Sequence, residues 1–274
     1  MEQRHIAFLG AGNMARSLIA GLRAAQFPGA LIHATDPDAQ KLAQLAGEFG
    51  IQVTQDNTAA ARAAQVIVLA VKPQYMAQML EQLTAELGSL EDRLVVSIAA
   101  GIKVARLSQL LGGHRKIVRC MPNTPALIGL GMTGLYAPGE VSDRDRAFAE
   151  AMLQAVGKTV WVGQETDING VIAASGSAPA YFFLLMQHMA EEAVRLGFSE
   201  ADARLLVQQT ALGAAQMVID NPATSLVTLR EQVTSKGGTT AEAVRTFEEG
   251  KLDELVSRAM QAAIVRAEEM EQLF

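Results

Sequence analysis

The first 160 or so residues alternate short runs of β-branched or aliphatic residues with longer amphipathic stretches. This rhythm predicts strand, helix, strand units with parallel pairing. Several runs are apolar at every position, as expected of strands that helices cover on both faces. We therefore expect a doubly wound α/β sheet of Rossmann type in a domain spanning residues 1–162. The expected strands are Ile6–Leu9, Leu31–Thr35, Val66–Val71, Leu94–Ala99, Lys116–Arg119, Met132–Tyr136 and Thr159–Val162.

The strand signals end at about Gly163, and helical spacing follows. It predicts a second, all-α domain over residues 163–274. The expected helix 200–219 has too many apolar positions for a single buried stripe, so we expect it to be buried on several sides. Because a small helical domain has few ways to cover such a helix alone, we expect a subunit interface there, in a homodimer or higher homo-oligomer. The expected helices are 179–196, 200–219 and 251–272.

Composition and charge argue against several classes of protein. Lys plus Arg number 23 and Asp plus Glu 29, which gives a formal net charge of −6; neither sign forms long runs, so nucleic acid is not expected as a partner. The apolar runs at Val66–Val71 and Leu94–Ala100 are shorter than the roughly 20 residues that cross a bilayer, so no membrane partner is expected. Cys120 is the only cysteine, and the opening residues lack the pattern of a secretion signal, which favours a cytoplasmic protein.

A glycine-rich turn directly follows the first expected strand. The segment Gly10–Ala15 (Gly-Ala-Gly-Asn-Met-Ala) stands between this strand and an expected helix, which is the context that the G-x-G-x-x-G/A dinucleotide-binding fingerprint requires. Gly10 allows the tight turn, Gly12 lets the backbone approach a pyrophosphate, and Ala15 permits close helix packing. Phosphate charge would then face the amino end of the helix. A glycine turn without a ligand is the weaker interpretation, because the strand and the helix stand where the fingerprint needs them.

An acidic residue, Asp36, follows the second expected strand. A carboxylate there can accept hydrogen bonds from both ribose hydroxyls of NAD. It would repel a 2′-phosphate, and no arginine stands at Thr35, Asp36 or Pro37 to offset the repulsion. Taken alone, Asp36 therefore favours NADH. Capping of the next helix by the segment Asp36–Asp38 is an equally good interpretation.

Five further segments extend this signal along essentially the whole chain. They are Ala70–Pro73, Ser97–Gly101, Met121–Pro125 (Met-Pro-Asn-Thr-Pro), Ser175–Tyr181 and Val233–Thr240 (Val-Thr-Ser-Lys-Gly-Gly-Thr-Thr). In order and spacing, these segments and the glycine turn resemble the pyrroline-5-carboxylate reductase family. A glycine fingerprint alone fits many dehydrogenases, whereas the third and fifth of these segments resemble this family in particular.

The resemblance implies an enzyme that reduces 1-pyrroline-5-carboxylate to L-proline with NAD(P)H, the last step of proline biosynthesis, and a dimerisation role for the all-α domain. It also implies that the cofactor groove lies at the carboxyl ends of strands, where open α/β sheets bind ligands. Lys72 could instead be a solvated loop lysine. Together with the glycine turn and Asp36, the expected cofactor-binding residues are Gly10, Gly12, Asn13, Met14, Asp36, Asn57, Ala70, Val71, Lys72, Pro73, Ala99, Ala100 and Gly101.

Two positions depart from the family's pattern. Ala178 stands where many members have a second glycine, which is tolerated if its φ is negative. Asp36 stands where members that use NADPH often have serine, threonine or an Asn-Arg pair. The resemblance thus implies NADPH while the charge argument favours NADH, and we expect NADPH with NADH as the alternative.

The implied substrate needs an anion site for its carboxylate, a hydride donor and a proton for its ring nitrogen. The segment Val233–Thr240 precedes a helical stretch, so backbone N–H groups can converge on a carboxylate at the amino end of that helix. Thr240 is the expected catalytic residue, because its hydroxyl could hydrogen-bond the ring nitrogen; Thr239 or Thr240 could instead cap the helix. The expected substrate-binding residues are Val233, Ser235, Gly238, Thr239, Thr240 and, by rough alignment, Glu165.

Hydride transfer to a protonated imine needs little covalent help, so positioning should dominate the catalysis. We expect no essential lysine or histidine. Glu165 could instead be a solvated acid at the start of a helix, and Cys120 is expected to be inert. No cluster of ligands has metal-binding spacing, so no metal is expected. The histidines His5, His33, His114 and His188 are expected to pack or to lie at the surface.

Three rival functions remain. A β-hydroxyacid dehydrogenase shares this domain order but uses a helical lysine as general acid and base, and the region Ser175–Met189 contains no lysine. A reductase of another small cyclic imine stays open. So does a non-catalytic dinucleotide-binding scaffold, although the Ser235–Thr240 segment argues for turnover.

Overall fold

The computed structural model describes residues 1–274 and divides into two compact units, which are described separately. Unit 1 comprises Met1–Ser177 together with Ala263–Phe274, and unit 2 comprises Ala178–Ala262. These limits differ from the expected boundary between residues 162 and 163. The side-chain amide of Asn123 donates to the carbonyl of Ser175 at 3.1 Å, which ties the residues beyond 162 to unit 1.

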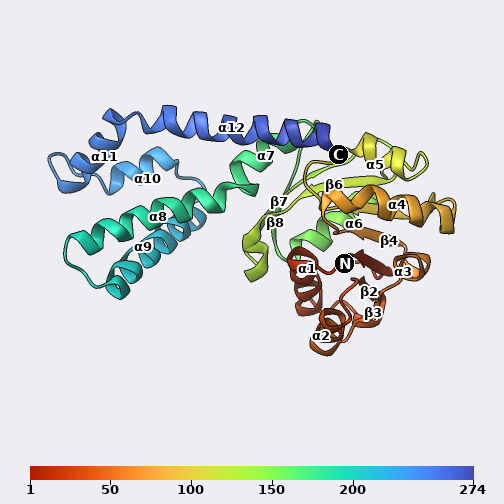
Figure 1. The fold of residues 1–274 in the computed structure, drawn as a ribbon. Helices are drawn as coiled ribbons and strands as arrows, with labels where there is room; N and C mark the ends of the chain where they lie inside the picture. Colours follow the sequence, from red (N-terminus) through yellow and green to blue (C-terminus); the bar gives the residue numbers. More distant parts are fainter. The chain divides into compact units, whose positions relative to one another are not determined.

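Unit 1 is built on one eight-stranded sheet with the order β3-β2-β1-β4-β5-β6-β7-β8 (Figure 1). All neighbours pair in parallel except β6 and β7, which are antiparallel. Three strands, β1, β4 and β5, are buried at every position, as their largely apolar sequences predict. The strands are β1 (Ile6–Leu9), β2 (Ile32–Thr35), β3 (Gln52–Thr54), β4 (Val66–Leu69), β5 (Leu94–Ser97), β6 (Ile117–Met121), β7 (Gly131–Tyr136) and β8 (Gly157–Trp161).

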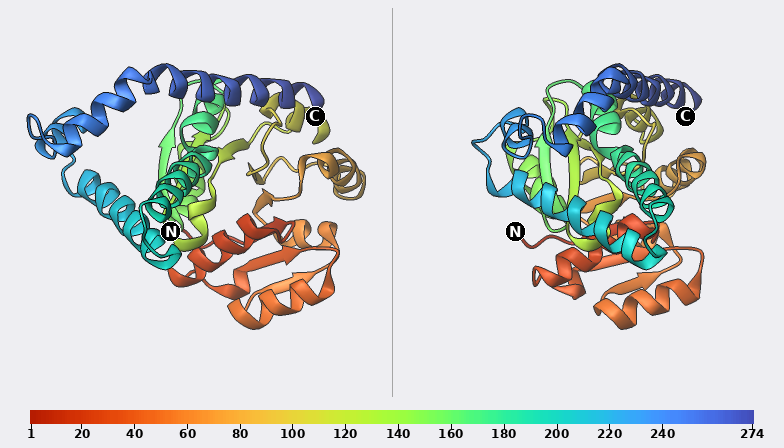
Figure 2. Two further views of the ribbon diagram at one scale, coloured as in Figure 1. Left: turned by 60° about the vertical axis from the view of Figure 1, so that its left-hand side comes forward. Right: turned by 90° about the vertical axis from the view of Figure 1, so that its left-hand side faces the viewer.

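Helices cover both faces of this sheet, so it is doubly wound (Figures 1 and 2). On one face, α1, α2 and α6 pack against alternate strand residues such as Phe8 and Val68. On the other face, α3, α4 and α5 pack against the intervening residues, such as Leu9 and Ile67. The helices are α1 (Asn13–Ala24), α2 (Ala39–Phe49), α3 (Asn57–Ala63), α4 (Pro73–Leu87), α5 (Val104–Leu110), α6 (Asp143–Gln154) and α7 (Asp167–Val171), with 3-10 turns at Gly29–Leu31 and Thr124–Ile128.

The Rossmann-type sheet confirms the expected fold class, but two details of the sheet were not foreseen. The short edge strand β3 was missed because its three residues carry no apolar run. The antiparallel pairing of β7 was also missed: Cys120 of β6 lies opposite Leu135 of β7 in this register. Residues Thr124–Ile128, a 3-10 turn, make up most of the connection between the two strands, which is too short for a helical crossover to a parallel neighbour.

Unit 2 is entirely helical, and no strand follows β8 in the chain. Three of its five helices, α8, α9 and α12, match the expected ranges to within one residue at each end. Ser199 caps α9 by accepting from the backbone N–H of Asp202 at 3.1 Å, as the capping-box pattern predicts. A π-helical turn, Ile172–Gly176, leads from α7 into α8, and α12 begins in unit 2 and ends in unit 1. The helices are α8 (Ala178–Arg195), α9 (Glu200–Asp220), α10 (Leu226–Gln232), α11 (Thr239–Glu249) and α12 (Leu252–Leu273).

Unit 2 leaves much of its apolar surface uncovered within one chain. Only Ala203 and Val207 of α9 are buried, whereas Leu212 and Ile219 are 59% and 68% exposed. Burial of α9 on several sides is therefore not achieved by the single chain.

One helical run, Asp167–Arg195, is long and apolar enough to cross a membrane by length and composition alone. Its 18-residue window has a mean hydropathy of 1.4 and is 22% buried. The expectation that all apolar runs are too short counted only unbroken apolar runs. It therefore passed over this one, in which serine, glycine, glutamine and histidine interrupt the apolar residues.

Candidate cofactor and substrate sites

The expected cofactor-binding residues gather at the carboxyl ends of four neighbouring strands in unit 1. Leu9 of β1 lies opposite Thr35 of β2 and Leu69 of β4, and Leu69 lies opposite Ser97 of β5. The strands therefore end at the same level. The chain leaves β1 between β2 and β4, which is the topological switch point where such sheets bind ligands.

The glycine turn adopts the conformation that its sequence predicts. Gly10 has a φ of +100°, and a Cβ there would lie 2.8 Å from the backbone of Ala70, so only glycine fits. A Cβ on Gly12 would meet nothing within 4 Å, so the backbone of Gly12 faces open space. No side chain caps α1, and its first N–H groups have no acceptor within the helix. These donors and this open space fit the pyrophosphate of a dinucleotide.

Asp36 lies between the glycine turn and α2. Its Oδ2 accepts from the backbone N–H of Ala11 at 3.2 Å and from Lys41 Nζ at 2.6 Å, and its Oδ1 accepts from the N–H of Asp38. Burial alone would raise the pKa of Asp36, but these hydrogen bonds and the charge of Lys41 outweigh it and lower the pKa. The cap of α2 is Asp38, which accepts from the N–H of Gln40 and Lys41. Asp36 is therefore not the capping residue.

Lys41 is the residue that sequence reasoning missed at this position. The search for a positive charge covered only Thr35–Pro37. Lys41 stands in the first turn of α2, and helical side chains point back toward the amino end. Placing the start of α2 at Ala39 would have brought this ammonium group to Asp36.

Two further expected groups flank the switch point. Asn57 is the first residue of α3, and its Oδ1 accepts from Thr35 Oγ1 at 2.5 Å. Ala70 continues from β4, with its N–H donating to the carbonyl of Leu9 at 2.9 Å. Pro73 occupies the first turn of α4 and Lys72 is its N-cap, a helix position that proline favours. Val71, between Ala70 and Lys72, is half-buried, and the Lys72 side chain is exposed.

The segment Ala99–Gly101 follows β5 and is packed from outside by the last turn of α12. Gly101 has a φ of +77°. A Cβ there would lie 3.2 Å from Met270 Cβ and 3.6 Å from Phe274 Cδ2. Both residues belong to unit 1, so this contact lies within that unit.

Glu165 is held in an ion cluster close to this segment. Its Oε1 accepts from the N–H of Val104 at 2.7 Å and from Arg119 at 3.0 Å. Arg119 also donates to Glu271 Oε1 at 2.9 Å, and Lys103 lies 3.0 Å from the other oxygen of Glu271. Glu165 is thus neither a solvated helix-start acid nor a free carboxylate.

The expected substrate loop lies in unit 2, between α10 and α11. Gly237 has a φ of +73°, and the N–H of Gly238 donates to the carbonyl of Ser235 at 3.0 Å. Helix α11 begins at Thr239 with Gly238 as its N-cap, and no side chain caps it. Thr239 and Thr240 are therefore helical residues whose hydroxyls do not cap α11, which answers the alternative left open above. Val233, Ser235, Thr239 and Thr240 are exposed, and Gly238 is half-buried.

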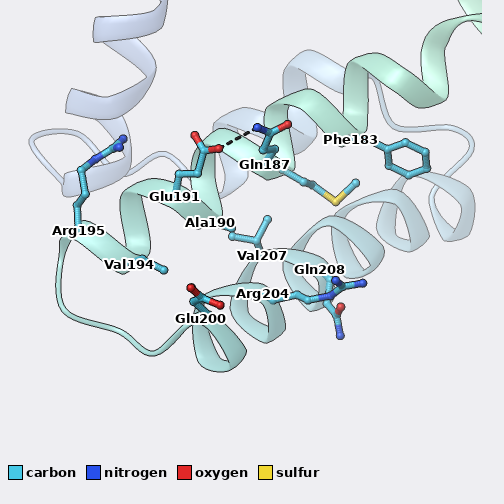
Figure 3. A pocket seen from close by; sticks show the side chains of 12 residues that line it. Phe183, Gln187, Ala190, Glu191, Val194, Arg195, Glu200, Arg204, Val207 and Gln208 are labelled. Carbon is cyan, nitrogen blue, oxygen red and sulfur yellow. Dashed lines mark hydrogen bonds between the residues drawn. The ribbon is translucent and has the colours of Figure 1, made fainter.

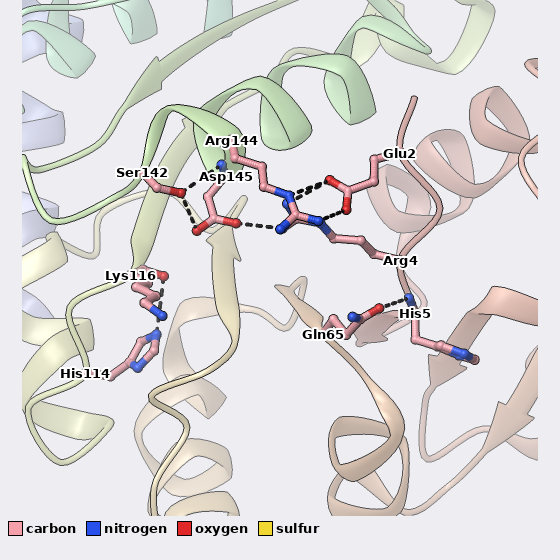
Figure 4. Close-up of polar contacts among 9 residues, drawn as sticks. All are labelled: Glu2, Arg4, His5, Gln65, His114, Lys116, Ser142, Arg144 and Asp145. Carbon is pink, nitrogen blue, oxygen red and sulfur yellow. Dashed lines mark hydrogen bonds and ion pairs between the residues drawn. The ribbon is translucent and has the colours of Figure 1, made fainter.

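Two of the histidines, His5 and His114, lie away from these sites, in separate polar contacts that Figure 4 shows. The N–H of His5 donates to Gln65 Oε1 at 3.1 Å, and the ring of His114 contacts the carbonyl of Lys116 at 3.3 Å. Glu2 contacts Arg4 and Arg144, whose hydrogen bonds lower its pKa to about 2. No group of three or more His, Cys, Asp or Glu side chains could hold a metal ion.

Cys120 and Ala178 both behave as their positions suggest. Cys120 is fully buried on β6, and burial raises the pKa of its thiol far above the usual range. Such a thiol is a poor nucleophile. Ala178 begins α8 and is not among the residues with positive φ, so its Cβ is tolerated in place of the family's glycine.

A groove of about 780 Å³ lies between α8 and α9 within unit 2 (Figure 3). Phe183, Val194 and Val207 contribute apolar surface, and Arg195, Glu200 and Arg204 place charges around it. Glu191 and Gln187 are hydrogen-bonded to each other at 2.8 Å. An apolar floor with a charged rim is typical of a protein–protein contact.

Two family models match the chain. Residues 5–101 match a model described as NADP oxidoreductase coenzyme F420-dependent, and residues 165–270 match one described as pyrroline-5-carboxylate reductase dimerisation. The pyrroline-5-carboxylate reductase of Vibrio alginolyticus is 56% identical over the full length of both chains. The chain belongs to the pyrroline-5-carboxylate reductase family. The pyrroline-5-carboxylate reductases of Haemophilus influenzae and Pseudomonas aeruginosa are 47% and 48% identical to this chain, over 100% and 98% of both chains, respectively.

Solved structures of this family share the fold over nearly the whole chain. The reductase from Coxiella burnetii superposes with a TM-score of 0.93 at 41% identity, covering 98% of this chain and 99% of that one. The Plasmodium falciparum enzyme, solved with NADP bound, gives a TM-score of 0.86 at 26% identity, covering 99% of each chain. The family resemblance drawn from the sequence segments is thereby confirmed.

Proposed function

We propose that this protein reduces 1-pyrroline-5-carboxylate to L-proline with NAD(P)H, as the last step of proline biosynthesis. Full-length membership of the family supports the reaction. The observation in this chain that carries the proposal is the uncapped amino end of α11 behind the Ser235–Gly238 turn. It offers unpaired N–H groups to a carboxylate beside the hydroxyl of Thr240, which suits an imino acid.

Unit 1 supplies a site that suits a dinucleotide. The amino end of α1 and the open space at Gly12 would receive the pyrophosphate, and Asp36 and Asn57 would face the adenosine half. Ala70–Pro73 and Ala99–Gly101 would line the path of the nicotinamide half. When bound, the reduced nicotinamide supplies the hydride. NADPH is proposed first, since the relative from Plasmodium falciparum was solved with NADP, with NADH as the alternative.

The residues of the substrate loop have separate roles in this proposal. The backbone N–H of Thr239 and the hydroxyl of Ser235 bind the carboxylate, and Val233 packs against the ring. Gly238, whose own N–H donates to the carbonyl of Ser235, has no side chain to obstruct the carboxylate. Thr240 donates a hydrogen bond to the ring nitrogen of the neutral imine, and the nitrogen takes up a proton from solvent through this hydroxyl as the nicotinamide supplies the hydride. That contact holds the C=N bond in one orientation, so the main contribution of the protein is positioning. Arg119 and Val104 occupy Oε1 of Glu165, so its proposed contact with the substrate is through Oε2.

Purified protein should oxidise NADPH or NADH only when 1-pyrroline-5-carboxylate is supplied. Parallel assays with a six-membered cyclic imine separate this function from reduction of another small imine. Failure to turn over any imine, with intact dinucleotide binding, would leave only the scaffold function.

Replacing Thr240 with valine should lower kcat/KM by about a hundredfold, the size typical of a lost proton-donating contact. Steady-state kinetics with the imine would measure it. Thr246→Val is the matched control, since Thr246 lies on the same helix and its hydroxyl only bonds the carbonyl of Glu242 at 2.9 Å. Ser235→Ala should instead raise KM, as expected of uniform binding. Unchanged turnover in Thr240→Val would remove this residue from the mechanism.

We further propose that the protein works as a homodimer or larger homo-oligomer in the cytoplasm. The match to a dimerisation model over residues 165–270 supports self-association. The same residues include the whole of the apolar run Asp167–Arg195, so a second copy, and not a bilayer, would cover it. No nucleic acid partner is proposed, given the net charge of −6.

A further inference from the structure

A buried arginine with two carboxylates stands outside the chemistry proposed above. Arg119, on β6, has a side chain only 2% exposed, and it pairs with Glu165 at 3.0 Å and with Glu271 at 2.9 Å. Glu271 itself is 3% exposed. Removing such ions from water is costly, and apolar residues of similar size often serve stability better. What an ion cluster adds is a defined geometry, because each oxygen must meet its own donor.

The two carboxylates contact neighbouring residues at the start of α5, one through the backbone and one through a side chain. Glu165 accepts the N–H of Val104, the first residue of α5, at 2.7 Å. Glu271 binds Lys103, the residue before it, at 3.0 Å. This stretch directly follows Ala99–Gly101. Its backbone is therefore held by Glu165, which Arg119 of β6 positions, and its lysine side chain is held by Glu271 of α12.

The last turn of α12 also touches the preceding turn directly. Met270 Cβ lies 3.2 Å from the place where a Cβ of Gly101 would stand. Phe274 packs against the cluster of buried residues that contains Ala99 and Ile102, and its carbonyl accepts from Arg106 Nε at 2.9 Å. Apolar residues at the end of α12 thus pack against Ala99–Gly101, and the ionic contacts hold the residues that follow it, Lys103 and Val104.

We propose that Arg119, Glu271 and the last turn of α12 form a clamp that positions Ala99–Gly101 for the nicotinamide end of the cofactor. The proposal rests on the proposed function, which places the nicotinamide at this segment. Arg119 and Glu271 are positioning residues that act through the backbone of Ala99–Val104. They leave the pyrophosphate and adenosine contacts at Gly10–Ala15 and Asp36 unchanged.

The test compares two ligands that differ only in the nicotinamide. Glu271→Gln keeps the shape of the side chain and removes its charge, and Glu268→Gln is the control, an exposed acid on the same helix. Calorimetric titration would measure the Kd of NADPH and of 2′-phospho-ADP-ribose, which lacks the nicotinamide ring. Glu271→Gln should raise the Kd of NADPH by about tenfold and leave the Kd of the fragment unchanged. Glu268→Gln should change neither.

A second variant, Phe274→Ala, removes the apolar part of the clamp and leaves every ion paired, so it serves if Glu271→Gln does not fold. It should show the same difference between the two ligands. Equal weakening of both ligands, or of neither, in the folded variants overturns the clamp. Selective loss of NADPH affinity supports it even if the protein fails to reduce 1-pyrroline-5-carboxylate, so binding and turnover judge the two proposals separately.

Discussion

Lys41 changes which cofactor the site around Asp36 can bind. A carboxylate after the second strand would ordinarily repel a 2′-phosphate, but here an ammonium group lies 2.6 Å from it. The pair carries no net charge, and the lysine side chain is 38% exposed, so it is free to turn toward a bound phosphate.

We expect Lys41→Gln to lower the ratio of kcat/KM for NADPH over NADH by about tenfold, because it leaves Asp36 unbalanced beside the 2′-phosphate. Asp36→Asn should shift the ratio the other way. Steady-state kinetics with both cofactors would measure it, with Lys158→Gln as a control at an exposed position on β8. An unchanged ratio in both variants would mean that this pair does not select the cofactor.

Single residues show where sequence reasoning stops. The fingerprint at Gly10 and Gly12 could be predicted because φ and backbone approach follow from residue type and local order. The partners of Asp36 and Glu165 could not, since Lys41 depends on where α2 starts and Arg119 is 46 residues from Glu165. Local sequence spacing does not predict contacts between separate helices and strands.

The secondary-structure elements were foreseen wherever their pattern was long. Helices α9 and α12 begin and end within a residue of the predicted limits, because 20 or so residues of helical period outweigh local noise. The strand β3 was too short to show a pattern. The contacts that the last turn of α12 makes within unit 1 were also missed. In the sequence Glu271 is indistinguishable from a surface acid, and only the fold shows that it pairs with Arg119.

These contacts of Glu271 should depend on pH. Burial alone would raise the pKa of Glu271, but Arg119 and Lys103 outweigh it and hold the pKa below its usual 4.5. A lowered folded-state pKa adds stability above the unfolded pKa, and this stability is lost as the pH falls through the folded-state value. We expect the free energy of unfolding to fall below about pH 4.5, and Glu271→Gln to flatten this dependence. Urea denaturation at a series of pH values would measure it. A curve in Glu271→Gln as steep as in Glu268→Gln would contradict the assignment.

Unit 2 leaves apolar side chains exposed to solvent in the single chain. Phe183 is 63% exposed beside the groove between α8 and α9, and the exposed apolar positions continue along both helices. A patch of this kind marks an association surface. The excess of apolar positions in α9 predicted such a surface, although the sequence did not show which residues would line the groove.

We expect light scattering after gel filtration to give at least the mass of a dimer, and Phe183→Asp to shift the protein toward the monomer, because a carboxylate would be buried without a partner. Gln82→Asp, an exposed change on α4 in unit 1, should keep the mass of the natural protein. A monomer in the natural protein at micromolar concentration would refute self-association.

The path of α12 has a consequence for how the chain is made. Arg119 and its partner Glu271 are 152 residues apart in the chain, and the whole of unit 2 is synthesised between them. On the ribosome the sheet up to β8 can assemble early, but Arg119 meets Glu271 only after unit 2 has emerged. Contacts of such long sequence separation form late in folding. Unit 1 is thus closed by residues that are translated after unit 2, and a chain interrupted within unit 2 would leave Gly101 uncovered.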